Sequence, residues 1–253
     1  NITALEVEGT FDDCQLLVKT AFLDEELNKK LNLSSANSIN IARLLPQSFY
    51  YTHAFSQLIK GQKDIYFCVP SGNFGNLCGG ILAKRMGLPI AGFIAASNIN
   101  DIVPSYLETA KYNPKPSVQT ISNAMDVGNP SNFARLMDYY NGDFNAISKD
   151  IKGISFDDNQ TKEIIQHVYH TYNYLMCPHT AIGYGGLKHY LKPDANGVYL
   201  STAHPCKFKD IVDPLISNEV EIPLRLQTII NKKKQAIPMT TAFGEFKSFL
   251  LES

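Results

Sequence analysis

The stretch that decides the fold is Ile65-Tyr-Phe-Cys-Val-Pro-Ser-Gly-Asn-Phe-Gly-Asn76. Its β-branched and aromatic run breaks into small polar residues and then reopens as a helix, which predicts a strand, a tight loop and a helix in succession. We expect Gly72 and Gly75 to let the backbone adopt a positive φ and approach a ligand closely. The following helix would aim unpaired N–H groups and its positive dipole end at the loop, which suits a phosphate. The alternative interpretation is a strand-to-helix turn that binds nothing.

The segments on either side of this loop predict an α/β fold. Strands are predicted over 1–9, 65–69, 90–96 and 197–201, and helices after Thr10 and over 42–59, 77–86, 161–176, 180–191, 211–216 and 243–251. Pro46 is awkward in the helix over 42–59 unless it lies in a first turn. The strands at 65–69 and 90–96 form a right-handed βαβ crossover, so a ligand is expected at their carboxyl ends. Residues 98–145, rich in Asn, Pro and Ser, predict loops and short helices.

Composition limits the classes of function. A net charge of −1 and 19% charged residues argue against the basic surface of a nucleic-acid-binding protein, and 44% hydrophobic residues argue against disorder. The five cysteines form no CxxC pair, which disfavours a zinc ribbon or a disulfide framework and favours a reducing, cytoplasmic setting. No run approaches 18 apolar residues, so we expect no membrane contact and small-molecule partners. His167 and His170 have a spacing compatible with a metal, but a solvated helix face is favoured and no metal is expected.

Five sequence blocks occur in order along the chain: Asn37-Ser-Ile-Asn-Ile-Ala-Arg43, Val69-Pro-Ser-Gly-Asn-Phe-Gly75, Ser122-Asn-Ala-Met-Asp-Val127, Cys177-Pro-His-Thr180 and Thr202-Ala-His-Pro-Cys-Lys-Phe208. On these blocks the chain resembles threonine synthase over nearly all of its length. The resemblance implies the type II fold of pyridoxal-phosphate-dependent enzymes, in which a three-layer, open, twisted and mainly parallel sheet is flanked by helices. It also implies conversion of O-phospho-L-homoserine and water to L-threonine and phosphate, with pyridoxal phosphate as cofactor.

The resemblance implies that one loop holds the phosphate of the cofactor. Its residues Gly72, Asn73, Phe74, Gly75 and Asn76 would bind mainly through backbone N–H groups, whose geometry suits an anion. Better-known members of the family carry Asp where this chain has Asn76, which leaves the role of that side chain open.

A second part of the implied cofactor site follows the strand over 197–201. Thr202 matches the family residue whose hydroxyl faces the pyridine nitrogen of the cofactor, and Ser201 is placed to share that contact. The alternative is a threonine that caps a turn.

The resemblance also implies a site for the phosphate of the substrate. Asn37, Ser38 and Arg43 match residues that hold it, since a guanidinium presents a planar fork to phosphate oxygens and the other two side chains add neutral donors. The alternative is that Asn37 and Ser38 cap the following helix and that Arg43 is a surface charge. Asn40 is a weaker candidate.

Three other residues of the matched blocks receive no catalytic role. His179 and His204 are interpreted as structural histidines, because His is often partly buried. Asp126 is interpreted as a residue that shapes the loop over the site.

Two motifs of the family are missing from the 253 residues: the Schiff-base lysine in a Lys-Asp-Phe-Gly context and a Ser-Gly-Asp-Thr-Gly loop. No catalytic residue is therefore assigned. We expect the C-terminal portion of the enzyme, truncated at the N-terminus and inactive alone, with residues 1–32 a βα remnant of the small domain and 33–253 the large cofactor-binding domain. The competing hypothesis is a noncatalytic, stand-alone domain that binds a phosphate or another ligand. The oligomeric state stays open.

Overall fold

The chain folds as two compact units. The computed structural model describes residues 2–58 and 64–252. A terminal unit combines Asn1–Ser35 with Ile222–Ser253, and a central unit spans Ala36–Glu221. The predicted division at residue 32 assigns 222–253 to the large domain, whereas in the structure these residues cluster with the N-terminal segment.

The terminal unit is built on a pair of parallel strands from the two ends of the chain. Strand β1 (Leu5–Val7) pairs with β6 (Ile237–Met239), and Leu5 lies opposite Ile237. The strand expected over 1–9 is thus shorter than predicted. The sequence pattern does not reveal β6, because a three-residue strand that contains a proline lacks a usable alternation. The helices of this unit are α1 (Phe11–Leu23), α2 (Glu25–Lys30), α12 (Leu224–Gln227) and α13 (Phe243–Glu252).

Local signals set the helices of the terminal unit. Thr10 begins α1 with the predicted N-cap: its hydroxyl accepts from the Asp13 amide at 3.3 Å, and the Asp13 carboxylate accepts from the Thr10 amide at 2.7 Å. Lys247 on α13 forms ion pairs with Asp24 at 2.8 Å and Glu26 at 3.0 Å, which connects the C-terminal helix to α2.

The central unit contains a four-stranded, wholly parallel sheet in the order β4-β3-β2-β5. Its strands are β2 (Ile65–Pro70), β3 (Gly92–Ser97), β4 (Ile151–Ser155) and β5 (Asn196–Tyr199). The predicted βαβ crossover is confirmed for β2 and β3. The edge strand β4 was not expected, because its sequence Ile-Lys-Gly-Ile-Ser is short and holds only two large apolar residues.

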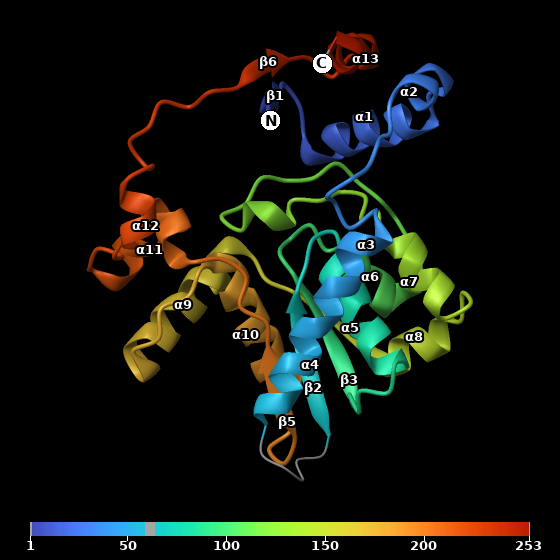
Figure 1. The fold of residues 1–253 in the computed structure, drawn as a ribbon. Coiled ribbons are helices and arrows are strands. Elements are labelled where there is room, and N and C mark those ends of the chain that lie inside the picture. Colours follow the sequence, from blue (N-terminus) through green and yellow to red (C-terminus); the bar gives the residue numbers. More distant parts are fainter. Residues whose placement is uncertain (1, 59–63, 253) are drawn as a thin grey trace. The chain divides into compact units, whose positions relative to one another are not determined.

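Helices cover both faces of this sheet (Figure 1). The described helices of the central unit are α3 (Ile41–Leu44), α4 (Ser48–Gln57), α5 (Gly75–Arg85), α6 (Ile102–Thr109), α7 (Phe133–Tyr139), α8 (Phe144–Asp150), α9 (Asp158–Tyr172), α10 (Pro178–Tyr190) and α11 (Lys209–Ile216). Short 3₁₀ turns accompany them at η1 (Leu45–Gln47), η2 (Asn123–Met125) and η3 (Pro205–Phe208). In the described residues, no helix has the length and apolar character needed to span a membrane.

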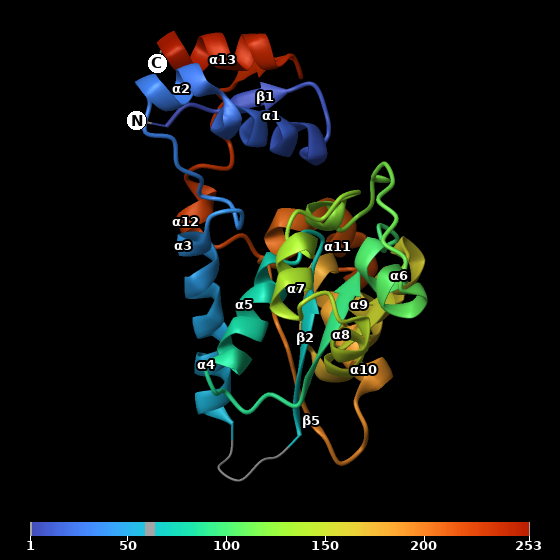
Figure 2. The same cartoon turned by 90° about the vertical axis from the view of Figure 1, so that its right-hand side faces the viewer.

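Alternation along β2 separates the two layers of the core. Phe67 and Val69 lie in the cluster that includes Tyr51 of α4, and the Tyr51 and Phe67 ring centroids are 5.0 Å apart. Cys68 lies in a second cluster with Ile182 of α10. Figure 2 shows α4 and α5 on one side of β2 and α10 on the other. The predicted three-layer arrangement is therefore confirmed.

The prediction of one continuous helix over 42–59 is wrong. It consists of α3, the 3₁₀ turn η1 and α4, and Pro46 lies at the start of η1. A proline lacks an N–H and clashes with the preceding turn, so it interrupts the α-helical ladder here. The end of the predicted helix at Ile59 and its Lys60-Gly61 stop lie outside the described residues.

Candidate functional site

The candidate phosphate loop follows the carboxyl end of β2 and turns directly into α5. Phe74 is the N-cap of α5 and adopts a left-handed conformation with φ 59°. The prediction of a positive φ at Gly72 and Gly75 is therefore wrong, because the residue of this loop in the left-handed conformation is Phe74. Helix α5 also begins at Gly75, two residues before the predicted start, which places Gly75 and Asn76 in its first turn.

The two glycines are required by close contacts from other segments. A Cβ on Gly72 would lie 2.6 Å from the Met125 Cα, and a Cβ on Gly75 would lie 2.6 Å from the Ser38 Cβ. Neither distance is tolerated by carbon atoms, so any larger residue displaces a neighbour. The segments that approach these glycines closely belong to the protein itself, and the predicted close approach to a ligand stays a prediction.

The loop lines a cavity of about 230 Å³ that suits an anion. The lining consists of Ser38, Gln47 and Tyr50 together with every residue from Pro70 to Asn76. Phe74 supplies no side-chain cap to α5, and the buried Ser71 hydroxyl oxygen has no hydrogen-bond partner among the described residues. A helix N-terminus with uncapped amides and an adjacent unpaired hydroxyl can satisfy phosphate oxygens.

Two asparagine side chains of the loop form hydrogen bonds with neighbouring segments. The Asn73 Oδ1 atom accepts from the Ser131 amide at 2.6 Å and from the Ser131 hydroxyl at 3.0 Å. The Tyr51 hydroxyl donates to the Asn76 carbonyl oxygen at 2.9 Å and to its Oδ1 at 3.0 Å. Burial raises the pKa of Tyr51, so this hydroxyl keeps its proton and remains a donor. These contacts give Asn76 a structural role that the sequence left open.

The segment proposed to hold the substrate phosphate lies beside the loop only in part. Ser38 lines the cavity, and its hydroxyl donates to the Asn37 Oδ1 atom at 3.2 Å. Arg43 is exposed, and its Nε donates to the Ala36 carbonyl at 3.1 Å. Neither Arg43 nor Asn37 lines the cavity. The N-cap of α3 is Asn40, whose Oδ1 accepts from the helix at 3.0 Å, so capping is not what Asn37 and Ser38 do there.

Thr202 lies at the same edge of the sheet as the loop, because β5 and β2 are parallel neighbours with Tyr199 opposite Cys68. The Thr202 amide donates to the Thr180 hydroxyl oxygen at 3.2 Å. The Thr202 hydroxyl lies 3.4 Å from the Thr180 hydroxyl and 3.4 Å from the Cys177 sulfur. This polar cluster was not predicted, although both partners belong to the block Cys177–Thr180. Thr202 does not line the 230 Å³ cavity.

Cys177 at the base of this cluster has an altered acidity. Burial raises its pKa, but the neighbouring side chains of His179, Thr180 and Thr202 lower it, and together they bring the pKa from 9.0 to about 6. His179 is buried, and its Nε2 accepts from the Ala124 amide at 3.1 Å. That bond links α10 to the segment containing Met125.

Asp126 receives a physical role from the structure. Its Oδ1 accepts from Asn98 Nδ2 at 2.8 Å, Asn100 Nδ2 at 3.1 Å and the Thr120 hydroxyl at 2.8 Å. This network fixes the loop after β3 and places the Met125 backbone against Gly72. Asp126 therefore supports the candidate phosphate loop from outside the cavity.

The other histidines singled out in the sequence lie elsewhere. His204 accepts from the Cys206 amide at 3.2 Å and caps η3, and His167 and His170 are exposed on α9. Within residues 2–58 and 64–252, no three His, Cys, Asp or Glu side chains are grouped to hold a metal ion.

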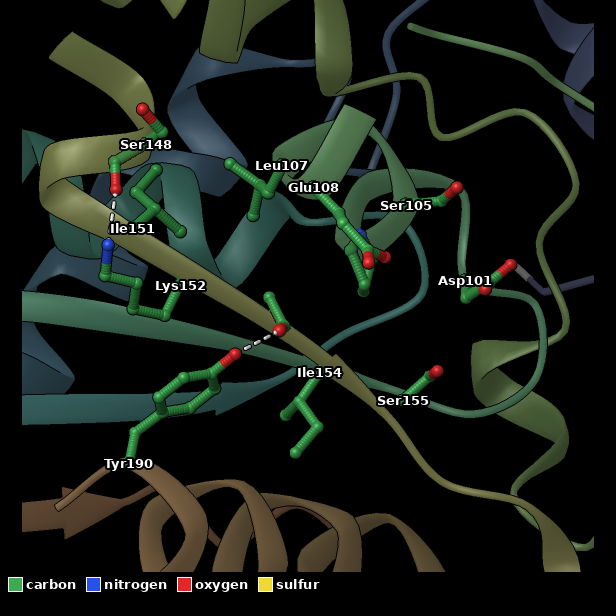
Figure 3. A pocket seen from close by; sticks show the side chains of 12 residues that line it. Asp101, Ser105, Leu107, Glu108, Ser148, Ile151, Lys152, Ile154, Ser155 and Tyr190 are labelled. Atoms are coloured by element: carbon green, nitrogen blue, oxygen red, sulfur yellow. Dashed lines mark hydrogen bonds between the residues drawn. The ribbon is translucent and has the colours of Figure 1, made fainter. Parts of the chain in front are cut away.

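A larger cavity of about 460 Å³ lies along the edge strand β4 (Figure 3). The Tyr190 hydroxyl donates to the Gly153 carbonyl at 2.8 Å, and the Lys152 ammonium donates to the Ser148 carbonyl at 2.9 Å. None of the predicted site residues lines it. The candidate site therefore remains at the carboxyl ends of β2 and β5.

Comparison with known proteins shows the family to which the chain belongs. A family model described as pyridoxal-phosphate dependent enzyme matches residues 2–202, and a model described as threonine synthase, C-terminal, matches residues 180–250. The threonine synthase of Buchnera aphidicola subsp. Schizaphis graminum is 44% identical over 256 residues, which cover 100% of this chain and 58% of that protein.

Solved structures give the same result. The threonine synthase of Escherichia coli matches with a TM-score of 0.94 and 38% identity over 99% of this chain and 58% of that chain. A pyridoxal-phosphate-bound threonine synthase from Brucella melitensis matches with a TM-score of 0.86 and 34% identity over 99% of this chain and 59% of that chain. The chain thus spans less than two thirds of these relatives, and the predicted type II fold is confirmed. The chain belongs to the family of pyridoxal-phosphate-dependent enzymes, and it resembles threonine synthases along its whole length.

Proposed function

We propose that this chain provides the phosphate-binding part of a threonine synthase, which converts O-phospho-L-homoserine and water to L-threonine and phosphate. One observation carries the proposal. Ser38 and the loop from Ser71 to Asn76 line the same cavity, so a segment matched to the substrate phosphate adjoins a loop matched to the cofactor phosphate. The reaction needs both anions in one site.

In this proposal the cofactor phosphate binds the loop Gly72, Asn73, Phe74, Gly75 and Asn76. The side chains of Asn73 and Asn76 already hold neighbouring segments, which leaves the backbone amides at the start of α5 for the anion. The Ser71 hydroxyl, which has no partner in the described part of the chain, adds a donor.

Thr202 would contact the pyridine nitrogen of the cofactor. Pyridoxal phosphate, when bound, withdraws electrons from the carbon atoms of the substrate. A hydroxyl holds a proton on the ring nitrogen less strongly than a carboxylate, so Thr202 moderates this effect. The Thr180 and Cys177 side chains at 3.4 Å orient the Thr202 hydroxyl.

The substrate phosphate would be held by Asn37, Ser38 and Arg43. Arg43 is anchored to the backbone of the same segment through its Nε, which leaves the rest of the fork for phosphate oxygens. The neutral donors of the other two residues permit release of the phosphate product.

The complete activity requires more than this chain. About two fifths of each relative lies outside the match, and the family's lysine motif is absent from these 253 residues. We therefore expect the 253 residues alone to be inactive. The five free cysteines are compatible with a cytoplasmic enzyme.

The decisive experiment compares the complete gene product with the 253-residue chain. The DNA upstream of Asn1 is sequenced, and both proteins are assayed for phosphate release from O-phospho-L-homoserine and for a specific borohydride-reducible adduct with pyridoxal phosphate. We expect a longer reading frame with the lysine motif, activity only in the longer protein, and no adduct in the chain. An initiating methionine just before Asn1, with phosphate binding but no turnover, would favour the noncatalytic binding domain.

A further inference from the structure

Asn132, next to α7, connects the two phosphate-binding segments through a single side chain. Its Nδ2 donates to the Ser38 hydroxyl at 2.8 Å and to the Asn73 carbonyl at 2.9 Å. The Asn132 side chain is fully buried. One amide group therefore touches the segment matched to the substrate phosphate and the loop matched to the cofactor phosphate.

Arg135, one turn later on α7, holds the same segment by its backbone. Its Nη1 donates to the Ser38 carbonyl at 2.8 Å, and its Nη2 donates to the Ile39 carbonyl at 3.1 Å. Nη1 also donates to the Asn132 Oδ1 atom. A planar guanidinium can serve these three acceptors together, whereas an ammonium group offers no such fixed fork.

The contact between Gly75 and Ser38 sets a lower limit on the distance between the segment 36–40 and the loop 71–76. The Gly75 Cα already leaves no room for a Cβ beside Ser38. The segment 36–40 therefore can neither move closer to the loop nor, with Arg135 and Asn132 in place, move away from it.

We propose that Asn132 and Arg135 are positioning residues that set the separation between the two phosphate-binding segments and thereby determine the affinity for a phosphorylated substrate. This inference rests on the proposed function. The resemblance assigns no role to either residue. Both would act on the position of the Ser38 segment and not on a phosphate directly.

The test uses the complete protein and the variants Arg135→Lys and Arg135→Met. Loss of charged hydrogen bonds to two carbonyls is expected to raise KM for O-phospho-L-homoserine about tenfold or more, with kcat and the absorption spectrum of the bound cofactor unchanged. The Arg135→Lys variant should recover little of the substrate affinity, because a single ammonium group cannot donate to both carbonyls in the geometry of the guanidinium. A double-mutant cycle of Asn132→Ala and Ser38→Ala should be strongly non-additive in KM, since the two changes remove one shared hydrogen bond.

Arg85→Met is the matched control. Arg85 is an exposed cation over the rings of Tyr139 and Tyr140 at 5.1 and 5.9 Å, so it contacts the end of α7 without touching either segment. Its KM should equal that of the wild type. An Arg135→Lys enzyme with the wild-type KM overturns the inference. So does a variant that loses stability and kcat while KM stays constant, because that pattern belongs to a purely structural residue.

A wild-type protein that does not turn over O-phospho-L-homoserine refutes the proposed function and leaves the positioning role open to a second measurement. Amide hydrogen exchange of the 253-residue chain reports on the segment directly. The Arg43 and Leu44 amides donate to the Asn40 carbonyl at 3.0 and 3.2 Å. Arg135→Met should speed their exchange and Arg85→Met should not. Equal exchange in both variants overturns the inference independently of catalysis.

Discussion

Gly75→Ala tests the packing on which the candidate site depends. The new Cβ would lie 2.6 Å from the Ser38 Cβ and 2.8 Å from its hydroxyl oxygen, so the two segments must separate by about 1 Å to reach ordinary contact. Overpacking of this kind costs about 1–3 kcal/mol, and the better helix propensity of alanine returns at most about 1 kcal/mol. We expect a net loss of about 1–2 kcal/mol in the free energy of unfolding.

Urea unfolding followed by circular dichroism measures this loss, since the chain has no tryptophan for fluorescence. Gly244→Ala is the control. Gly244 also lies in the first turn of a helix, but a Cβ there would have no neighbour within 4 Å, so the change should be neutral or stabilising. Ser38→Gly should recover part of the loss when combined with Gly75→Ala, because it removes the atoms that clash. A Gly75→Ala chain as stable as the wild type would refute the described contact with Ser38.

Three other predictions concern the surroundings of the site. In the complete protein, Arg43→Ala should raise KM for the phosphorylated substrate about 10–100-fold while cofactor content stays constant, and an equal loss of cofactor would contradict the assignment. The Cys177 pKa of about 6 lies below the ordinary 9.0, so only the unfolded thiol keeps its proton between these values. The free energy of unfolding should therefore rise with pH from about 6 to 9, by up to about 1.4 kcal/mol per unit, and this gain is lost as the pH falls through 6. Urea titrations of Cys177→Ser should lack the rise; an unchanged slope would assign it to another group. Asp126→Ala should cost about 1–3 kcal/mol in urea unfolding, whereas the exposed Asp138→Ala should change little, and equal effects would contradict the network.

The position of the candidate phosphate loop was predictable from local sequence. A strand that ends in small residues and continues as a helix carries its own signals, and these located the loop at the carboxyl end of β2. Which residue takes the left-handed conformation was not predictable, because it depends on where α5 starts. The need for glycine at positions 72 and 75 comes from Met125 and Ser38, which approach from other parts of the chain.

The strands and contacts that could not be predicted from the sequence depend on segments far away in the chain. Strands β4 and β6 are short and carry Lys, Gly or Pro, so their pairing comes from neighbouring strands and not from their own pattern. Asn132 and Arg135 contact Ser38 across 94 and 97 residues. No periodicity or spacing records a contact of that range, and both residues lie in a region interpreted only as loops and short helices.

The parallel pairing of β1 with β6 imposes an order on biosynthesis. During synthesis β1 leaves the ribosome before β6, and residues 36–221 lie between them. The pair of Leu5 with Ile237 can therefore form only after the central unit has emerged. The central sheet has all its strands before that point and can assemble without either terminus. A nascent polypeptide that stalls or is cut before residue 237 would thus hold all four strands of the central sheet but lack the β1–β6 pair. A strand edge left without this partner is suited to capture by chaperones and proteases.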